Sequence, residues 1–260
     1  MSASPRDFIR LLRIPQWTKN GLVLAGYLFS LGDPAQHAGA HALATALAAA
    51  FLFCLASSGV YILNDVRDAE ADRAHPLKRN RPIARGAVAV PSALALSAAL
   101  VLVALGGSLA LSPGFAGALA AYLLLQGLYS LVLKHVALAD VFAIAAGFLL
   151  RAVAGAVAIG VDFSPWLLLC TLMLALFLGF CKRRQELVAL QDGEPAQRPA
   201  LRHYNRAVLD QLIAISAAAA VVCYSLYTLW PGTVEKYGTR ALSATIPIVV
   251  FGIFRYVFLV

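Results

Sequence analysis

Charged side chains and cysteines are both scarce in this chain. Of its 260 residues only 13% are charged and 61% are hydrophobic, whereas soluble domains are about 45–50% apolar. The low charge argues against a soluble globular domain and predicts an integral membrane protein. The cysteines lie singly in or at the ends of apolar runs, without the spacing of a disulfide framework or a zinc site. They are Cys54, Cys170, Cys181 and Cys223.

Long apolar runs make up most of the chain, and most of them reach the ~17–25 residues that a membrane-spanning helix needs. We therefore predict an all-α, polytopic membrane helix bundle of about eight transmembrane helices, organised as a single domain over residues 1–260. The first run is short, so its helix is expected to begin nearer Trp17. The basic segment before it predicts an interfacial helix instead of a signal peptide. The runs are Gly21–Leu31, His41–Leu63, Ala87–Leu111, Phe115–Leu133, Val141–Val161, Trp166–Cys181, Leu209–Trp230 and Ala241–Val260.

Acidic residues are the scarcer charge, with 13 Asp and Glu against 21 Lys and Arg and a formal net charge of +8. Of the basic residues, 4 lie in residues 1–20, 6 in 64–90, 1 at Lys134 and 6 in 182–208, so 17 share one side if the runs are alternating spans. The positive-inside rule makes that side cytoplasmic. This predicts an inner (cytoplasmic) membrane protein with its polar site facing the cytoplasm, and no nucleic-acid partner is needed to explain the charge.

One segment gathers acidic and basic residues between two apolar runs: "YILNDVRDAEADRAHPLKRNRPIARG", residues 61–86. Four of its side chains share one face if the second helix continues by two turns, because they recur at helical spacing. These are Asn64, Asp65, Asp68 and Asp72, and Tyr61 extends the face inward. Like charges so placed repel, so we expect a cation there, and oxygen ligands beside a substrate phosphate suit Mg²⁺. The alternative is a solvated edge of the membrane.

Basic residues follow this acidic face along the chain. Lys78 and Arg81 are suited to phosphate oxygens, Arg through a bidentate fork and Lys as a point charge. Pro76 and Pro82 bound the stretch and predict a turn. Carboxylates for a metal, followed by cations for phosphate, together predict a diphosphate site.

The stretch "NDVRDAEADRAHPLKRNRP" resembles the first signature of the UbiA-type intramembrane prenyltransferase superfamily, N-D-x-x-D-x-x-x-D followed by a Lys and an Arg-Pro. Other blocks are similar to one branch, the decaprenyl-phosphate phosphoribosyltransferases: "RIPQWTKNGLVLA" with Lys19, "YSLVLKH" with Tyr129, "GFLLRAVAGAVA", "GFCKRRQEL" and "FRYVFLV". The resemblance implies a bundle of about nine helices, of which this chain supplies about eight. It also implies cytoplasmic cap loops over a cavity that opens sideways to lipid.

Superfamily members that use lipid diphosphates typically carry a second Asp-x-x-x-Asp motif. In "LKHVALADVFAIAAGFLLRA" only Asp140 is present, with Ile144 four residues later, which argues against a second metal site. Lys134 and Arg151 lie nearby in the sequence. Arg151 follows Asp140 by about 16 Å of helix, inside the bilayer, where an ionisable residue costs at least ~2.5–3.5 kcal/mol. It is either functional or a structural Arg bonded to carbonyls or an acid.

One carboxylate cluster with surplus cations suits two anionic substrates. With the resemblance, this predicts Mg²⁺-dependent transfer of 5-phosphoribosyl from phosphoribosyl diphosphate (PRPP) to a polyprenyl, decaprenyl-like phosphate, held by Lys134 with Lys182 or Arg183. The expected catalytic residues are Asp65, Asp68 and Asp140, and the expected metal ligands are Asn64, Asp65, Asp68 and Asp72. The expected substrate-binding residues are Lys19, Tyr61, Lys78, Arg81, Tyr129, Lys134, Arg151, Lys182 and Arg183. Asp140 is expected to order Lys134 or to bind a sugar hydroxyl.

Two alternatives use the same features. A UbiA-type prenyltransferase would ionise an allylic diphosphate at the first motif and move the prenyl group to an aromatic or other acceptor. A polyanion transporter would also carry cations within its spans, but the runs show no obvious inverted repeat and an acidic mouth opposes the passage of anions. A homo-oligomer is left open by the sequence.

Overall fold

The computed structural model describes residues 4–33, 39–162, 164–191 and 199–260, and within these ranges the chain forms helices and no strands. The helices, with η marking a 3₁₀ helix, are α1 (Pro5–Leu12), η1 (Ile14–Leu24), α2 (Ala25–Ser30), α3 (Ala40–Arg67), α4 (Ala69–Ala74), η2 (Lys78–Asn80), α5 (Val90–Leu111), α6 (Pro113–Leu131), η3 (Leu133–His135), α7 (Ala139–Ile159), α8 (Pro165–Gln191), η4 (Pro199–His203), α9 (Arg206–Leu229), α10 (Pro231–Tyr237), η5 (Ala241–Thr245) and α11 (Ile246–Leu259).

Seven of the described stretches are long and apolar enough to cross a membrane: Ala40–Arg67, Val90–Leu111, Pro113–Leu131, Ala139–Ile159, Pro165–Ala189, Arg206–Leu229 and Ala241–Leu259. The predicted all-α, polytopic membrane architecture is confirmed. The number of helices differs at the first expected run, residues 21–31. That run is divided between η1 and the short helix α2, and it is not among the seven.

The chain divides into two compact units. Unit 1 consists of Met1–Tyr27, Gly39–Ser130 and Leu150–Gly160, and unit 2 consists of Leu28–Ala38, Leu131–Leu149 and Val161–Val260. The acidic face at the end of α3 belongs to unit 1, whereas Asp140 and the basic residues of α8 belong to unit 2. The single domain expected over residues 1–260 stays a prediction.

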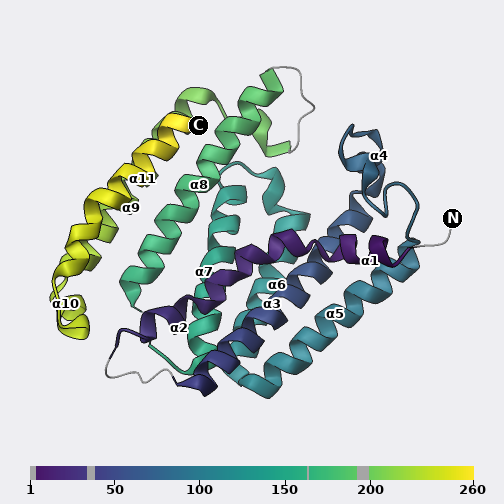
Figure 1. The fold of residues 1–260 in the computed structure, drawn as a ribbon. Coiled ribbons are helices and arrows are strands. Elements are labelled where there is room, and N and C mark those ends of the chain that lie inside the picture. Colours follow the sequence, from purple (N-terminus) through teal and green to yellow (C-terminus); the bar gives the residue numbers. More distant parts are fainter. Residues whose placement is uncertain (1–3, 34–38, 163, 192–198) are drawn as a thin grey trace. The chain divides into compact units, whose positions relative to one another are not determined.

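The core of unit 1 forms where α3 lies along α5 (Figure 1). Phe53 of α3 is fully buried there and packs with Phe115 of α6. A Cβ on Gly59 would come within 3.1 Å of the Ser97 carbonyl oxygen, so the close approach of the two helices depends on a small residue. Ser97 Oγ donates a hydrogen bond of 2.7 Å to the Gly59 carbonyl at the same point. The helix that carries the start of the first signature therefore packs closely on α5 at Gly59.

The 3₁₀ helix η1 packs backbone to backbone against the second half of α7. A Cβ on Gly155 would lie 1.8 Å from the Val23 carbonyl oxygen, and a Cβ on Gly26 would lie 2.9 Å from Ala156 Cα. Because these contacts are with main-chain atoms, a side chain at either glycine would push the segments apart. In unit 1 the first apolar run is thus packed on protein at short range, and it does not form a helix of spanning length.

A separate apolar cluster joins α1 to the turn that follows η2. Leu11 of α1 is buried in the same cluster as Ile83 and Val88 of that turn. The turn is closed by hydrogen bonds of 2.9 Å and 3.2 Å from the N–H groups of Ala87 and Val88 to the Pro82 carbonyl. The cluster places the N-terminal helix beside the basic end of the first motif.

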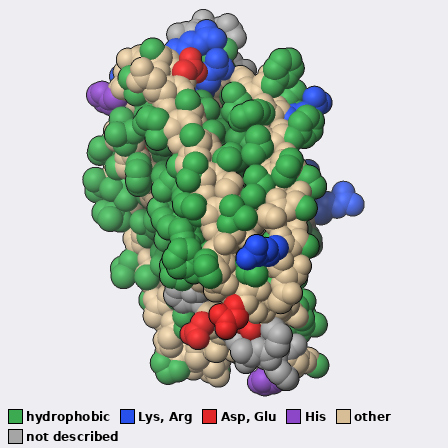
Figure 2. Space-filling view, turned by 90° about the vertical axis from the view of Figure 1, so that its left-hand side faces the viewer, with side chains coloured by type: hydrophobic (Ala, Val, Ile, Leu, Met, Phe, Trp, Pro, Cys, Tyr) green, Lys and Arg blue, Asp and Glu red, His purple; other side chains and the backbone are tan. Residues whose placement is uncertain are grey.

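In unit 2, α8 lies along α9, and α11 also packs on α9 (Figure 1). A Cβ on Gly179 of α8 would lie 2.6 Å from a methyl group of Val141 at the start of α7. Figure 2, which looks onto the side where α9 and α11 lie, shows apolar side chains over most of its middle, with charged side chains mostly towards its ends. Phe251 and Phe254 of α11 are exposed, as expected for a helix of spanning length that faces lipid.

Candidate active site

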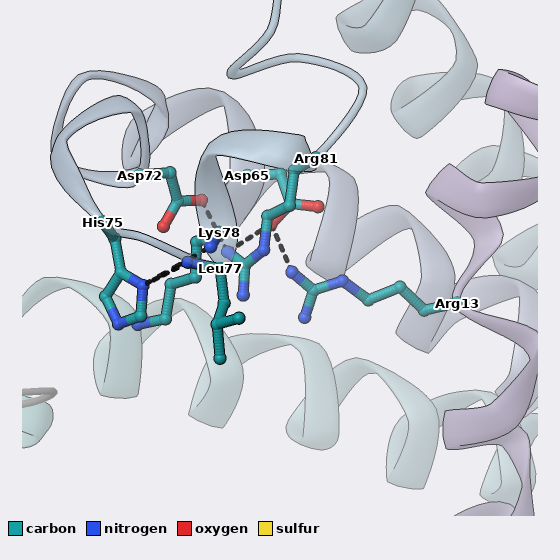
Figure 3. A network of polar contacts seen from close by, with 7 residues as sticks. All are labelled: Arg13, Asp65, Asp72, His75, Leu77, Lys78 and Arg81. Atoms are coloured by element: carbon teal, nitrogen blue, oxygen red, sulfur yellow. Dashed lines mark hydrogen bonds and ion pairs between the residues drawn. The ribbon is translucent and has the colours of Figure 1, made fainter.

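Two aspartates of the acidic face share one arginine (Figure 3). Arg81 Nη1 lies 3.0 Å from Asp65 Oδ1 and 2.6 Å from Asp72 Oδ2. Asp65 is on the last turn of α3 and Asp72 is in α4, and each is only 4% exposed. The Arg81 side chain is 30% exposed, so solvent reaches the cation more readily than the two anions. One positively charged nitrogen therefore lies between two buried carboxylates.

A second arginine reaches Asp65 from the N-terminal segment. Arg13 Nη2 forms an ion pair with Asp65 Oδ1, and the Arg13 guanidinium carbon lies 5.3 Å from the centre of the Tyr61 ring (Figure 3). Arg13 ends α1 in the left-handed conformation, with φ 51° and ψ 46°. No role was predicted for Arg13, because 52 residues separate it from Asp65 and no local spacing connects them. Its place in the block "RIPQWTKNGLVLA" was the only signal.

The acidic face is divided between two helices, which corrects the expectation of one continuous helix. α3 ends at Arg67, Asp68 follows with φ −91° and ψ 5°, and α4 begins at Ala69. Carboxylates in the last turn of a helix oppose its dipole, and aspartate is a weak helix former, so an interruption here has a physical cause. The break allows Asp72 to meet the same arginine as Asp65.

Asn64 makes a different contact from the two aspartates. Its Oδ1 accepts a hydrogen bond of 2.8 Å from Ser130 Oγ at the end of α6. Asp68 is half-buried at the junction of α3 and α4. Metal-ligand roles for Asn64 and Asp68 stay predictions, as they do for Asp65 and Asp72.

The turn before Arg81 is held by hydrogen bonds to His75, a residue for which no role was predicted. His75 Nδ1 accepts hydrogen bonds from the amide N–H groups of Leu77, at 3.2 Å, and Lys78, at 3.4 Å (Figure 3). Lys78 then begins η2 with a half-buried side chain. His75 thus holds the backbone of the segment that carries both predicted phosphate-binding cations.

Arg151 is buried inside unit 1, at 4% exposed, among neutral polar groups. Its Nε donates a hydrogen bond of 2.8 Å to Asn20 Oδ1, and its Nη2 donates one of 2.9 Å to Tyr122 Oη. The Tyr122 ring centre lies 4.7 Å from the guanidinium carbon, a distance at which a ring attracts a cation. Asn20 in turn donates to Ser57 Oγ at 3.0 Å. These bonds favour the structural alternative for Arg151, and its substrate-binding role stays a prediction.

A second polar cluster lies in unit 2 at the start of α7. Arg183 Nε lies 3.1 Å from Asp140 Oδ2, and Arg183 Nη1 pairs with Glu186 one turn later on α8. Arg183 and Asp140 are both 0% exposed. Tyr204 Oη donates a hydrogen bond of 2.8 Å to Asp140 Oδ1 and accepts one of 2.6 Å from the Leu138 N–H. Asp140 thus forms an ion pair with Arg183 and accepts a hydrogen bond from Tyr204, and neither contact was predicted from the sequence.

The electrostatic state of Tyr204 follows from this setting. Burial raises the pKa of its hydroxyl, and the hydrogen bond to the Asp140 carboxylate raises the pKa further. The hydroxyl therefore stays protonated and donates to Asp140 across the physiological pH range.

The remaining predicted residues differ in exposure. The Lys182 side chain is 60% exposed, and its Nζ lies 4.0 Å from Glu186. Lys134 is half-buried in η3, Tyr129 is half-buried near the end of α6, and Lys19 is exposed in η1. Their substrate-binding roles, like that of half-buried Tyr61, stay predictions.

The oxygen donors of the acidic face can be compared with those that a bound metal ion requires. Within the part of the chain that the structure describes, three or more His, Cys, Asp or Glu side chains do not gather closely enough to hold a metal ion by themselves. Asp65 and Asp72 nevertheless share a single cationic nitrogen, and Mg²⁺ is usually held by one or two carboxylates together with substrate phosphates. The residues therefore fit a divalent cation that arrives with a phosphate-bearing substrate.

Several solved structures share this fold. A UbiA homologue from Archaeoglobus fulgidus bound to DMAPP and Mg²⁺ matches with a TM-score of 0.75 at 17% identity, over 97% of this chain and 86% of that chain. A digeranylgeranylglyceryl phosphate synthase structure matches with a TM-score of 0.69 at 17% identity, over 98% and 95%. At these identities the likeness establishes the fold alone, and it confirms the predicted UbiA-type architecture.

Other relatives are more similar in sequence to this chain. The decaprenyl-phosphate phosphoribosyltransferase of Mycolicibacterium smegmatis is 40% identical over 219 residues, which cover 84% of this chain and 69% of that protein. The protein of the same name from Corynebacterium glutamicum is 36% identical over 235 residues, covering 90% and 69%. The model of the UbiA prenyltransferase family matches residues 22–260. The resemblance inferred from the motifs is thereby confirmed, and the chain belongs to the UbiA prenyltransferase family.

Proposed function

We propose that this membrane protein transfers 5-phosphoribosyl from PRPP to a polyprenyl phosphate and releases diphosphate. The observation that carries the proposal is the pair of buried aspartates around one arginine nitrogen, at 3.0 Å and 2.6 Å. It lies in a chain 36–40% identical to proteins named decaprenyl-phosphate phosphoribosyltransferase. A cation between two carboxylates, with further basic residues beside it, suits a substrate with a diphosphate leaving group.

The donor site is assigned to the first motif. Asp65 and Asp72, with Asn64 and Asp68 as neighbouring donors, would hold Mg²⁺. Bound there, Mg²⁺ would neutralise charge on the departing diphosphate. Support comes from the position of Arg81, whose partly exposed guanidinium can exchange a carboxylate partner for a phosphate oxygen.

Further basic residues complete the donor site. Lys78 adds a second cation for the phosphates. Arg13, which shares Asp65 with Arg81, is placed to do the same from the N-terminal segment. Lys19 and Tyr61 are assigned to the same side of the substrate site.

The acceptor site is assigned to the basic residues of unit 2. Lys134 and exposed Lys182 would hold the acceptor phosphate. Tyr129, at the end of α6 in unit 1, is assigned to substrate binding by the sequence pattern alone. Arg183 and Asp140 neutralise each other inside unit 2, so we assign them to the support of this site. The acceptor's prenyl chain would lie in the membrane, where the apolar outer faces of the helices face lipid.

The proposed reaction forms one bond and breaks one bond. An oxygen of the acceptor phosphate attacks carbon 1 of the ribose as the bond from carbon 1 to the diphosphate oxygen breaks. The acceptor phosphate is already ionised, so no general base is required, and the residues act by orientation and charge. Attack from the face opposite the leaving group inverts the configuration at carbon 1, and a product that retains it would contradict this mechanism.

The test uses purified protein in lipid nanodiscs with Mg²⁺ and PRPP labelled in the ribose. Label should appear in a polyprenyl phosphate product, and the product should disappear when EDTA is added or Asp65→Asn is used. Transfer of label from a prenyl diphosphate to an aromatic acceptor, with none from PRPP, would establish prenyl transfer instead.

Labelling of engineered cysteines in inverted vesicles would test the assignment of the motif to the cytoplasmic face of the inner membrane.

A further inference from the structure

The turn that carries Lys134 contains a backbone conformation that needs support. It joins α6 to α7, and Leu138 near its end has φ 67°. For a residue with a Cβ, the left-handed region is disfavoured because Cβ approaches the following carbonyl oxygen. A leucine retains this conformation only where surrounding bonds favour it over the alternatives.

Tyr204 supplies those bonds. Its Oη accepts the Leu138 N–H at 2.6 Å and donates to Asp140 Oδ1 at 2.8 Å. Tyr204 is 7% exposed, directly after η4, and belongs to the same apolar core as Leu201. The hydroxyl is therefore a fixed bridge between the last residues of the turn and the first turn of α7.

The far side of Asp140 is fixed as well. Arg183 Nε lies 3.1 Å from Asp140 Oδ2, and both side chains are 0% exposed. Since Glu186 also pairs with Arg183, the guanidinium is held from two sides. An ion pair from α8 to Asp140 is thus followed by two hydrogen bonds, from Tyr204 to Asp140 and from the Leu138 N–H to Tyr204.

We infer that Tyr204 is a positioning residue for the acceptor: by fixing Leu138 it holds the turn, and with it Lys134, where the phosphate of the polyprenyl phosphate binds. This rests on the proposed function, because Lys134 is assigned there to the acceptor. Tyr204 acts through Lys134 and touches no reacting atom. Loss of the hydroxyl lets the turn relax into more than one conformation, which lowers the fraction of protein ready to bind the acceptor.

The experiment compares Tyr204→Phe with Tyr224→Phe. Tyr224 is a matched control in the same unit, because its hydroxyl also makes a short hydrogen bond, 2.7 Å to Thr245 Oγ1, away from the turn. In nanodiscs, Tyr204→Phe should raise the KM for polyprenyl phosphate about tenfold while the KM for PRPP changes less than twofold. Tyr224→Phe should leave both constants within twofold. An unchanged acceptor KM, or an equal rise in both, overturns the inference.

A double-mutant comparison separates positioning from general destabilisation. Lys134→Gln should itself raise the acceptor KM, and adding Tyr204→Phe in that background should raise it no further, because both act at one point. Additive effects would overturn the inference. If Tyr204→Phe does not fold, amide exchange of the wild-type chain decides: the peptide with the Leu138 amide should be protected, and rapid exchange counts against the inference.

The outcomes also separate this inference from the function on which it rests. A wild-type protein that transfers no label from PRPP to polyprenyl phosphate overturns the proposed function, and the inference with it. A fully active wild type, with a Tyr204→Phe variant of normal acceptor KM, overturns the inference alone.

Discussion

The polar clusters of the two units both pair arginine with aspartate, but they differ in how far the arginine is exposed to solvent. In unit 1, Arg13 and Arg81 hold Asp65 with side chains that are 27% and 30% exposed. In unit 2, Arg183 holds Asp140 with both side chains at 0% exposure. A partly hydrated arginine can leave a carboxylate at small cost, whereas a fully buried arginine cannot. We therefore expect the arginines of the unit 1 cluster to exchange a carboxylate for a substrate phosphate, and Arg183 in unit 2 to keep its carboxylate partners.

The largest expected effect comes from removing an anion of unit 1. Asp65→Asn should lower kcat/KM on the order of 10³-fold, about 4 kcal/mol of transition-state stabilisation, because Arg81 loses one of the two carboxylates between which a metal would sit. Thermal unfolding in detergent should change little, since the arginines left behind are partly exposed. A large loss of stability with activity retained would contradict the exchangeable character of this cluster.

Removing the cation of unit 2 should give the opposite pattern. Arg183→Met leaves the Asp140 carboxylate, which is 0% exposed, without its cationic partner, and this should destabilise the fold by about 3–5 kcal/mol. The measurement is the midpoint of thermal unfolding in nanodiscs, with Lys182→Met as the control because that side chain is 60% exposed. A stable but inactive Arg183→Met would instead assign Arg183 to substrate binding.

A smaller effect is expected from Arg13→Gln. Asp65 keeps Arg81 as a partner, so the donor site should survive with weaker binding, and the KM for PRPP should rise about tenfold, or 1.4 kcal/mol. Arg10→Gln is a suitable control, because Arg10 lies on α1 with its side chain exposed. Equal effects of the two substitutions on the PRPP KM would show that loss of positive charge, and not the contact with Asp65, is responsible.

The smallest expected effect concerns the ion pair between Arg85 and Asp7, which joins the turn after Arg81 to α1. The Arg85 side chain is 40% exposed although that of Asp7 is 9% exposed, so solvent screens the pair from the Arg85 side and we expect about 0.2–1 kcal/mol, as for surface pairs. In a double-mutant cycle of Asp7→Asn and Arg85→Gln, the coupling measured on the PRPP KM should stay in that range. A coupling above 2 kcal/mol would show that this pair is as strong as a buried ion pair, like that of Arg183 and Asp140.

Patterns along the sequence predicted the membrane class and the first motif, because hydropathy and helical spacing are local. Asp65, Asp72 and Arg81 lie within 17 residues of one another, and they meet in the structure. The helix break at Asp68 is a local event that the spacing argument missed, since spacing assumes that a helix continues.

Contacts between distant residues could not be predicted. The bond between Asp140 and Tyr204 spans 64 residues, and the pair of Arg13 and Asp65 spans 52. A single sequence contains no signal that links such positions, and Arg183 was predicted to bind the acceptor phosphate, without a link to Asp140. Its burial accompanies the packing of α8 on the start of α7, where Asp140 and Val141 lie.

The glycine contact between η1 and α7 bears on how hydropathy itself is interpreted. Hydropathy scales treat lipid as the solvent of an apolar segment, but the main chain at Val23 has a protein backbone as its neighbour, so close that a methyl group on Gly155 would lie 1.8 Å from its carbonyl oxygen. For such a segment the relevant solvent is the protein itself. Apolar composition then reports an internal surface, and an apolar run need not have the length of a bilayer.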